Sequence, residues 1–154
     1  MTPINNDPTN QGTLPLTRQL NILLVDDDDI AIFISQRIAE MSRLFKSIRS
    51  ATNGQKALDI LNESTTSNTT VPDIILLDLD MPIMNGLAFL ESFHASCFPD
   101  KNRITIIILT SSLSENDKME SKRFGVRHFL SKPLTLETLN NALCSISKSQ
   151  TSDQ

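Results

Sequence analysis

Acidic, hydroxyl and amino side chains follow four separate apolar runs of the 154-residue chain. Asp26 and Asp27 come after LNILLV (20–25), and Asp78 comes after IILL (74–77). Thr110 comes after ITIIIL (104–109), and Lys132 follows RHFLS (127–131). If these runs are neighbouring parallel strands, their carboxyl ends meet at one edge of a sheet, where ligands bind in such folds. The five side chains are then expected in one pocket.

Three carboxylates in one pocket repel one another and raise one another's pKa unless cations balance them. Lys132 supplies one positive charge, and a hard divalent ion such as Mg²⁺, which binds carboxylates, water and substrate phosphate, would balance the rest. A carboxylate beside Mg²⁺, an ammonium and a hydroxyl can take up a phosphoryl group, because the cations offset charge on the equatorial oxygens during in-line attack. Asp78 lies centrally among these groups and is the expected nucleophile.

The elements that must position these side chains alternate along the chain. The apolar runs 20–25, 74–77 and 104–109 lack in/out alternation, as strands buried on both faces of a parallel sheet do. Weaker strands are expected at 46–51 and 127–131. Helical spacing fills the gaps, and the pattern predicts an α/β fold with a doubly wound parallel sheet and helices on both faces. The first helix carries one apolar stripe, formed by Ile30, Phe33, Ile34, Ile38 and Met41.

Four further helices are expected after Asn53-Gly54, after Asn85-Gly86, over 114–124, and after Thr135, which with Thr138 is the expected N-terminal cap. Residues 64–70 and 96–102 are predicted to be loops from their composition. Residues 1–18 are expected to form a flexible arm, 19–148 one domain, and 149–154 a disordered tail. Because six residues follow the last helix, no output domain is expected after it.

Composition excludes several classes of protein. Hydrophobic residues make up 39% of the chain, which suffices for a core, and 14 basic against 18 acidic residues give a net charge of −4. Without a basic excess, direct binding to nucleic acid is not expected. The chain shows neither a secretory signal nor an apolar run of membrane length, so a cytoplasmic protein is predicted. Cys97 and Cys144 are too few for a disulfide framework or zinc site and are expected to be buried.

The chain resembles the receiver domain of two-component response regulators from about Leu20 to about Ile146. The matching segments are ILLVDDDD (22–29), DIILLDLDMPIMNG (73–86), ILTSS (108–112) and FLSKPL (129–134). The resemblance implies a flavodoxin-like (βα)5 fold with strand order 2-1-3-4-5. It also implies a stand-alone receiver similar to chemotaxis regulators, which promotes its own phosphorylation and dephosphorylation and is not a turnover enzyme.

The resemblance also implies roles for single residues. Asp78 matches the phosphoacceptor, and Asp26, Asp27 and Asp78 match the side chains that hold Mg²⁺, with Mn²⁺ as an alternative. Asp80 matches the position whose backbone carbonyl binds the metal. Thr110 and Lys132 match the groups that stabilise the phosphoryl group, and the Lys132–Pro133 peptide is expected to be cis.

Phosphorylation of Asp78 would add charge and acceptor oxygens that draw Thr110 and Lys132 toward it. Phe129, which is the only aromatic residue of the fifth strand, would then turn into the space behind Thr110. An ordinary core role for Phe129 is the alternative. The resemblance implies a sensor histidine kinase or a histidine phosphotransfer protein as donor, and a downstream protein bound by the face of the fourth helix, fifth strand and fifth helix.

Two other functions compete with the receiver hypothesis. The segment DLD (78–80) resembles the nucleophile motif of haloacid-dehalogenase-type phosphatases. Those enzymes carry that motif on their first strand, whereas Asp26 and Asp27 precede it here, and the chain has no room for a cap domain. The second alternative is a receiver that is never phosphorylated and serves only as a docking module. The presence of all five side chains that phosphoryl transfer needs argues against it.

Overall fold

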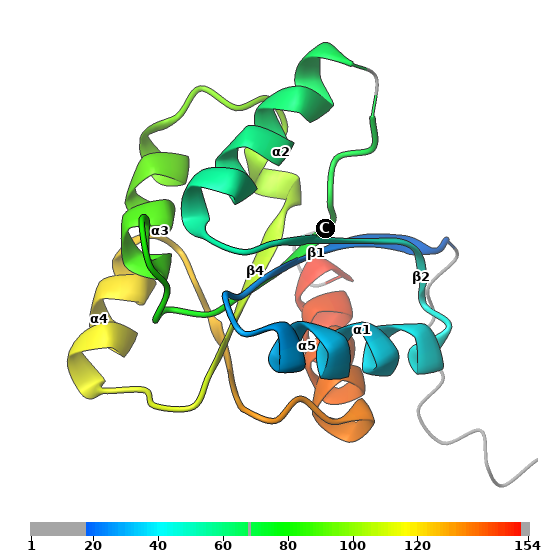
Figure 1. The fold of residues 1–154 in the computed structure, drawn as a ribbon. Helices are drawn as coiled ribbons and strands as arrows, with labels where there is room; N and C mark the ends of the chain where they lie inside the picture. The colour runs from blue at the N-terminus through cyan, green and yellow to red at the C-terminus, as the bar shows by residue number, and fades with distance from the viewer. Residues whose placement is uncertain (1–17, 68, 152–154) are drawn as a thin grey trace, which may run out of the picture.

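Residues 18–67 and 69–151 are described by a computed structural model. Five parallel strands form one sheet in the order β2-β1-β3-β4-β5, which confirms the predicted α/β fold (Figure 1). The strands are β1 (Leu20–Val25), β2 (Phe45–Ala51), β3 (Ile74–Leu77), β4 (Thr105–Thr110) and β5 (His128–Ser131).

A helix follows each strand. The helices are α1 (Asp29–Ser42), α2 (Gly54–Thr66), α3 (Gly86–Ala95), α4 (Glu115–Arg123) and α5 (Leu136–Thr151), with a 3-10 turn, η1 (Lys101–Arg103), before β4. A polar side chain caps each of the first four helices by accepting a hydrogen bond from a backbone N–H of the first turn. These caps are Asp28, Asn53, Asn85 and Ser114.

The predicted cap of the last helix is also present. Thr135 Oγ1 accepts from the Thr138 N–H at 3.1 Å, and Thr138 Oγ1 accepts from the Thr135 N–H at 3.2 Å. This reciprocal pair satisfies two backbone donors at the start of α5, as a capping box does.

Successive strand residues point to opposite faces of the sheet, and each face has its own apolar core. On one face, Ile22 and Leu24 of β1 belong to the cluster that includes Ala39 of α1 and Leu139 of α5. On the other face, Leu23 and Val25 belong to the cluster with residues of α2 and α3. Figure 1 shows α1 and α5 on one side of the sheet and α2, α3 and α4 on the other. Both faces of the central strands are therefore buried, as their unbroken apolar runs predicted.

The apolar stripe expected on the first helix is only partly buried: Ile38 packs against the core and Ile34 is half-buried, whereas its other three residues are exposed. Ile30, Phe33 and Met41 are 70%, 63% and 61% exposed. The buried residues of α1 are Ser35 and Ala39. Small residues on this face let α1 approach the sheet closely, and they leave the larger side chains at the surface.

Several local expectations also need correction. The helix α2 continues to Thr66, and the hydroxyls of Ser64, Thr65 and Thr66 hydrogen bond back to carbonyls of the preceding turn. The helix α5 continues to Thr151, into the segment expected as a tail. Cys97 is exposed and Cys144 is half-buried, so neither cysteine is fully buried.

Residues 1–17 of the expected arm and residues 152–154 of the expected tail lie outside the described residues. Arg18, the last residue of that arm, forms an ion pair with Asp73 at 2.8 Å. Among the helices of the described ranges, none combines the length and the apolar character that crossing a bilayer requires.

Candidate functional site

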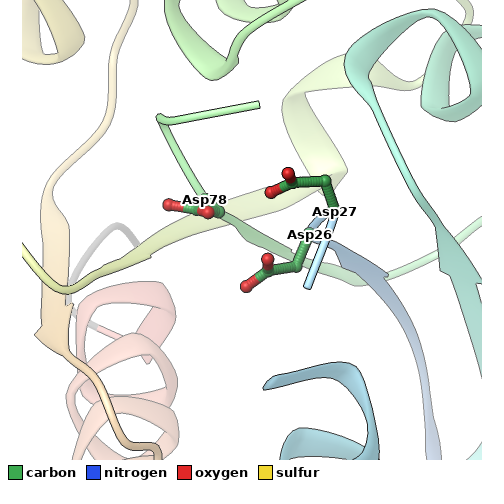
Figure 2. Close-up of side chains that lie close together, drawn as sticks. All are labelled: Asp26, Asp27 and Asp78. Atoms are coloured by element: carbon green, nitrogen blue, oxygen red, sulfur yellow. The ribbon is translucent and has the colours of Figure 1, made fainter. Parts of the chain in front are cut away.

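The ends of β1 and β3 bring the three aspartates together. Val25 of β1 pairs with Leu77 of β3, so Asp26 and Asp78 leave neighbouring strands at the same level. One carboxylate oxygen from each of Asp26, Asp27 and Asp78 lies within 4.8 Å of the others. Figure 2 shows Asp26 and Asp27 at the end of β1 and Asp78 at the end of β3. Parallel pairing thus gathers the acidic side chains that the sequence places far apart.

Asp26 is the more structural member of this cluster. It is 6% exposed, and its Oδ1 accepts a hydrogen bond from the Asp28 N–H at 2.9 Å. Its Oδ2 lies 2.6 Å from Lys132 Nζ. Asp26 therefore fixes both the turn that leads into α1 and the position of the ammonium.

Asp78 lies almost wholly inside the protein, with 5% of the residue exposed. Its Oδ1 accepts from the Asp80 N–H at 3.3 Å, and its Oδ2 accepts from Lys132 Nζ at 3.2 Å. Burial and then the negative charge of Asp26 raise the pKa of Asp78, although Lys132 and the Asp80 N–H oppose this shift. The site therefore stabilises the charged form of Asp78 less well than water does.

Lys132 joins the two buried carboxylates. Only 18% of its side chain is exposed, and its ammonium contacts both Asp26 and Asp78. Burial by itself lowers the pKa of Lys132, but the hydrogen bond and charge of Asp26, followed by those of Asp78, raise it above its usual value. The Lys132 N–H donates to the Thr110 carbonyl at 3.0 Å, which fixes the start of this loop against β4. The Lys132–Pro133 peptide bond is cis, as expected.

The hydroxyl of Thr110 points into its own loop. Thr110 is 3% exposed at the end of β4, and its Oγ1 donates to the Ser112 carbonyl at 3.2 Å. The structure therefore brings Thr110 to the correct edge of the sheet, while its hydrogen bond is made to Ser112. The ring of Phe129, on β5, is half-buried against the core on the α2–α3 face.

Asp27 and Asp80 lie on the solvent side of the site, and both residues are exposed. Asp27 belongs to the carboxylate cluster, whereas the side chain of Asp80 does not. The backbone N–H of Asp80 holds Asp78. Asp27 thus lies close to Asp26 and Asp78, at the edge of the sheet where the sequence placed it.

A closed loop follows Asp78. The Gly86 N–H donates to the Leu79 carbonyl at 3.0 Å. A Cβ at Gly86 would lie 2.5 Å from the Asp78 carbonyl oxygen, so a larger residue there would clash with the backbone of Asp78. The glycine therefore lets α3 begin directly against the main chain that carries this aspartate.

The donor set fits a hard divalent cation. Three carboxylates converge, one of them exposed, and Lys132 is the one ammonium that contacts them within the described part of the chain. The cluster thus carries a negative excess, and oxygen ligands are those that Mg²⁺ prefers.

Two contacts were not predicted from the sequence. The ion pair between Lys132 and Asp26 is shorter than that between Lys132 and Asp78, whereas the sequence placed Lys132 in one pocket with all three carboxylates and did not single out Asp26 as its partner. The Thr110–Ser112 hydrogen bond was also missed. The strand-end positions signalled that Asp26 and Lys132 would lie close together, whereas the hydrogen bond depends on a loop path that the sequence pattern does not specify.

Comparison with known proteins identifies the family. The sequence model of the response regulator receiver domain matches residues 22–144. A protein-glutamate methylesterase/protein-glutamine glutaminase of Treponema pallidum is 33% identical over 124 residues, which cover 79% of this chain and 28% of that protein. The chain thus spans less than a third of this relative.

Solved structures give the same result. A two-component response regulator from Cytophaga hutchinsonii superposes with a TM-score of 0.75 and 34% identity, covering 85% of this chain and 99% of that one. The Mn(2+)-bound form of response regulator Rcp1 gives a TM-score of 0.66 and 28% identity, covering 84% and 92% of the two chains. Receivers of this family are phosphoacceptors of two-component signalling, not phosphatases that turn over a separate substrate. Since the match spans most of the described residues, this chain belongs to the response regulator receiver domain family.

Proposed function

We propose that Asp78 accepts a phosphoryl group from the phosphohistidine of a sensor histidine kinase or histidine phosphotransfer protein, and that this changes a protein-binding surface. The observation that carries the proposal is the bridge made by Lys132. Its ammonium contacts Asp26 and Asp78 at 2.6 and 3.2 Å, beside an exposed third carboxylate. This is the arrangement of a nucleophile held next to fixed positive charge.

In the proposed transfer, an oxygen of the Asp78 carboxylate forms a bond to phosphorus while the bond from phosphorus to the imidazole nitrogen breaks. The imidazole leaves with that electron pair. The product is an acyl phosphate on Asp78, and Lys132 offsets part of its added charge. The burial that raises the pKa of Asp78 also leaves its carboxylate weakly solvated, which favours nucleophilic attack.

Asp26, Asp27 and Asp78, with the backbone carbonyl of Asp80, would hold Mg²⁺, with Mn²⁺ as an alternative. The bound ion would neutralise charge on the phosphoryl oxygens. The convergence of the three carboxylates supports this part of the proposal, as does the similarity to a receiver described in its Mn(2+)-bound form.

Thr110 and Phe129 would carry the change away from Asp78. In the proposed switch, the Thr110 hydroxyl exchanges the Ser112 carbonyl for a phosphoryl oxygen, and Phe129 turns into the space that is left. Both residues lie at or near the β4–β5 side of the site, so the movement would alter the face made by α4, β5 and α5. A downstream protein would bind that face.

The surface beside the site suits a protein donor. A groove between α1 and the loop after β5 is lined mostly by apolar side chains, including Ile30, Ile34, Pro133 and Leu134. Ile30 and Phe33 are largely exposed, so these two side chains are free to contact another protein. A phosphohistidine domain that reaches Asp78 would cover these side chains. The proposal includes a cytoplasmic location, because phosphohistidine is made from cytoplasmic ATP.

We also propose that the domain formed by residues 19–148 acts as a stand-alone receiver. The chain covers 99% of the Cytophaga hutchinsonii response regulator, which supports a receiver that functions at this length. In this form it would act by binding another protein.

Intact-mass measurement after incubation with acetyl phosphate and Mg²⁺ tests the proposal. We expect the wild-type protein to gain one phosphoryl mass and Asp78→Asn to gain none. Asp59→Asn, which removes an exposed aspartate that contacts Gln55 on α2, is the matched control and should behave as wild type. Equal uptake by Asp78→Asn would refute the assignment, no uptake by the wild type would favour the docking module, and steady turnover of a phosphate ester would favour the phosphatase.

A further inference from the structure

A lysine of α4 lies over the ring that we propose to move. Lys118 Nζ is 5.7 Å from the centroid of the Phe129 ring. This is within the distance of about 6 Å at which an ammonium is attracted to the face of an aromatic ring. Both residues are half-buried, which reduces the competition from water. The contact joins α4 directly to β5.

Within the described residues, no carboxylate competes with the ring for the ammonium of Lys118. Among the ion pairs of residues 18–67 and 69–151, none includes Lys118. Glu120, a half-buried acid on the same helix, instead pairs with Arg123 at 3.1 Å. Within the described part of the chain, the face of the Phe129 ring is therefore the partner of the Lys118 ammonium.

Few other contacts hold α4 in place. Its single buried residue is Ser121, and its large apolar side chain, Met119, is 66% exposed. Helices gain most of their stability in proteins from an apolar face packed on the core. Because α4 has little such packing, one ion–ring contact is a substantial part of its connection to β5.

We propose that Lys118 is a positioning residue that holds the Phe129 ring under α4, so that its charge sets how readily the ring moves toward Thr110. This inference rests on the proposed phosphoryl switch and adds its regulation. A ring that turns toward Thr110 must leave the ammonium, so the contact favours the ring position seen here. A ligand or modification shifts such an equilibrium only by its different interaction with the two positions.

Loss of the charge should shift the equilibrium about two- to fivefold toward the turned ring, as expected for a partly exposed cation–π pair. If the turned ring favours phosphoryl uptake, the rate of uptake should rise by the same factor, because the competent fraction rises. Lys118→Met retains most of the side chain's length and apolar stem, so packing on the ring is largely kept. Lys118→Arg retains the charge and should behave as wild type.

The test compares Lys118→Met, Lys118→Arg and Lys122→Met, the last of which removes an exposed lysine from the same helix. The Phe129 ring resonances are recorded by NMR without phosphodonor, and the initial rate of phosphoryl uptake is measured with acetyl phosphate and Mg²⁺. We expect shifted ring resonances and two- to fivefold faster uptake in Lys118→Met alone. Introducing Lys118→Met into a Phe129→Leu background should then change the uptake rate no further.

Ring resonances or uptake rates that are the same in Lys118→Met and Lys122→Met would overturn the inference. The inference would also be overturned if Lys118→Arg, which keeps the charge, showed the same change as Lys118→Met. If no variant takes up phosphate, the proposed function fails, and the resonances alone then decide whether Lys118 positions the ring. Should Lys118→Met not fold, Lys118→Gln provides the same loss of charge.

Discussion

Replacing Lys132 with methionine removes the ammonium that separates two buried carboxylates. Asp26 and Asp78, which are 6% and 5% exposed, would face each other without this counter-charge. Breaking a buried ion pair by removing one partner costs about 3–5 kcal/mol. Since domains have about 5–15 kcal/mol of stability, the variant should still fold at low temperature. The midpoint of thermal unfolding should fall by about 6–20 °C, at about 2–4 °C per kcal/mol for a domain of this size.

The pH dependence of this loss has a defined sign. The pKa of Lys132 is raised in the folded protein, so the stability it contributes is fully present below its ordinary value of 10.5 and disappears as pH rises through the raised pKa. The difference between wild type and Lys132→Met should therefore close in strong alkali. It should also shrink as pH falls toward 4, because protonation of Asp78 relieves the repulsion.

Urea and thermal unfolding followed by circular dichroism at pH 4, 7 and 11 would measure these effects, with Lys122→Met as the matched exposed control. If Lys132→Met unfolded at the same urea concentration as wild type at pH 7, the two carboxylates would not depend on this ammonium. The electrostatic account of the site would then be wrong.

Three further outcomes follow from the same geometry. Asp78→Asn should unfold at a higher temperature than wild type at pH 7, because the raised pKa of Asp78 means that ionisation costs folding energy; the gain should vanish as pH falls below 3.8, and a gain independent of pH would contradict this cause. Mg²⁺ should raise the unfolding temperature of wild type and raise it much less in Asp27→Asn, measured by calorimetry with a sodium salt at the same ionic strength as the control. Equal shifts in the two proteins would show that Asp27 does not bind the metal. Phe33→Ser should leave stability within about 0.5 kcal/mol, as for other exposed sites, and leave uptake from acetyl phosphate unchanged, yet slow transfer from a phosphohistidine protein; equal slowing with both donors would contradict a docking role.

The sheet and the composition of the site were predictable because both depend on short patterns. Apolar runs such as 20–25 and 74–77 are long enough to identify buried strands, and parallel pairing then dictates where Asp26 and Asp78 meet. Helix starts were predictable for a similar reason. A capping pair such as Thr135 and Thr138 acts within one turn, so its geometry is set by sequence spacing.

The orientation of α1 was not predictable from hydrophobicity. Ile30 and Phe33 have helical spacing, yet they are exposed, and the helix packs on the sheet with Ser35 and Ala39, flanked by the partly buried Ile32 and Ile38. Periodicity identifies a stripe but does not reveal whether the core or a partner covers it. The small side chains of the true interface contribute little to an apolar pattern, even though they allow the closest approach.

The contacts around the proposed switch were also beyond the sequence. The Thr110–Ser112 hydrogen bond depends on the path of one loop, and the Lys118–Phe129 contact depends on how α4 lies over β5. Neither path is set by local spacing. The first is a contact within one loop whose path has no sequence signature, and the second depends on packing between elements that are separated along the chain.

The close fit at Gly86 has a consequence for how a signal could leave this site. The start of α3 lies so close to the main chain of Asp78 that there is no space for even a methyl group at Gly86. The main chain that carries Asp78 is therefore closely packed. If Asp78 were phosphorylated, the loop after β3 and the start of α3 would have little room to move in response. In the proposed switch, the response would therefore pass to the β4 and β5 side of the molecule, and the close packing at Gly86 would help to set the direction of signalling.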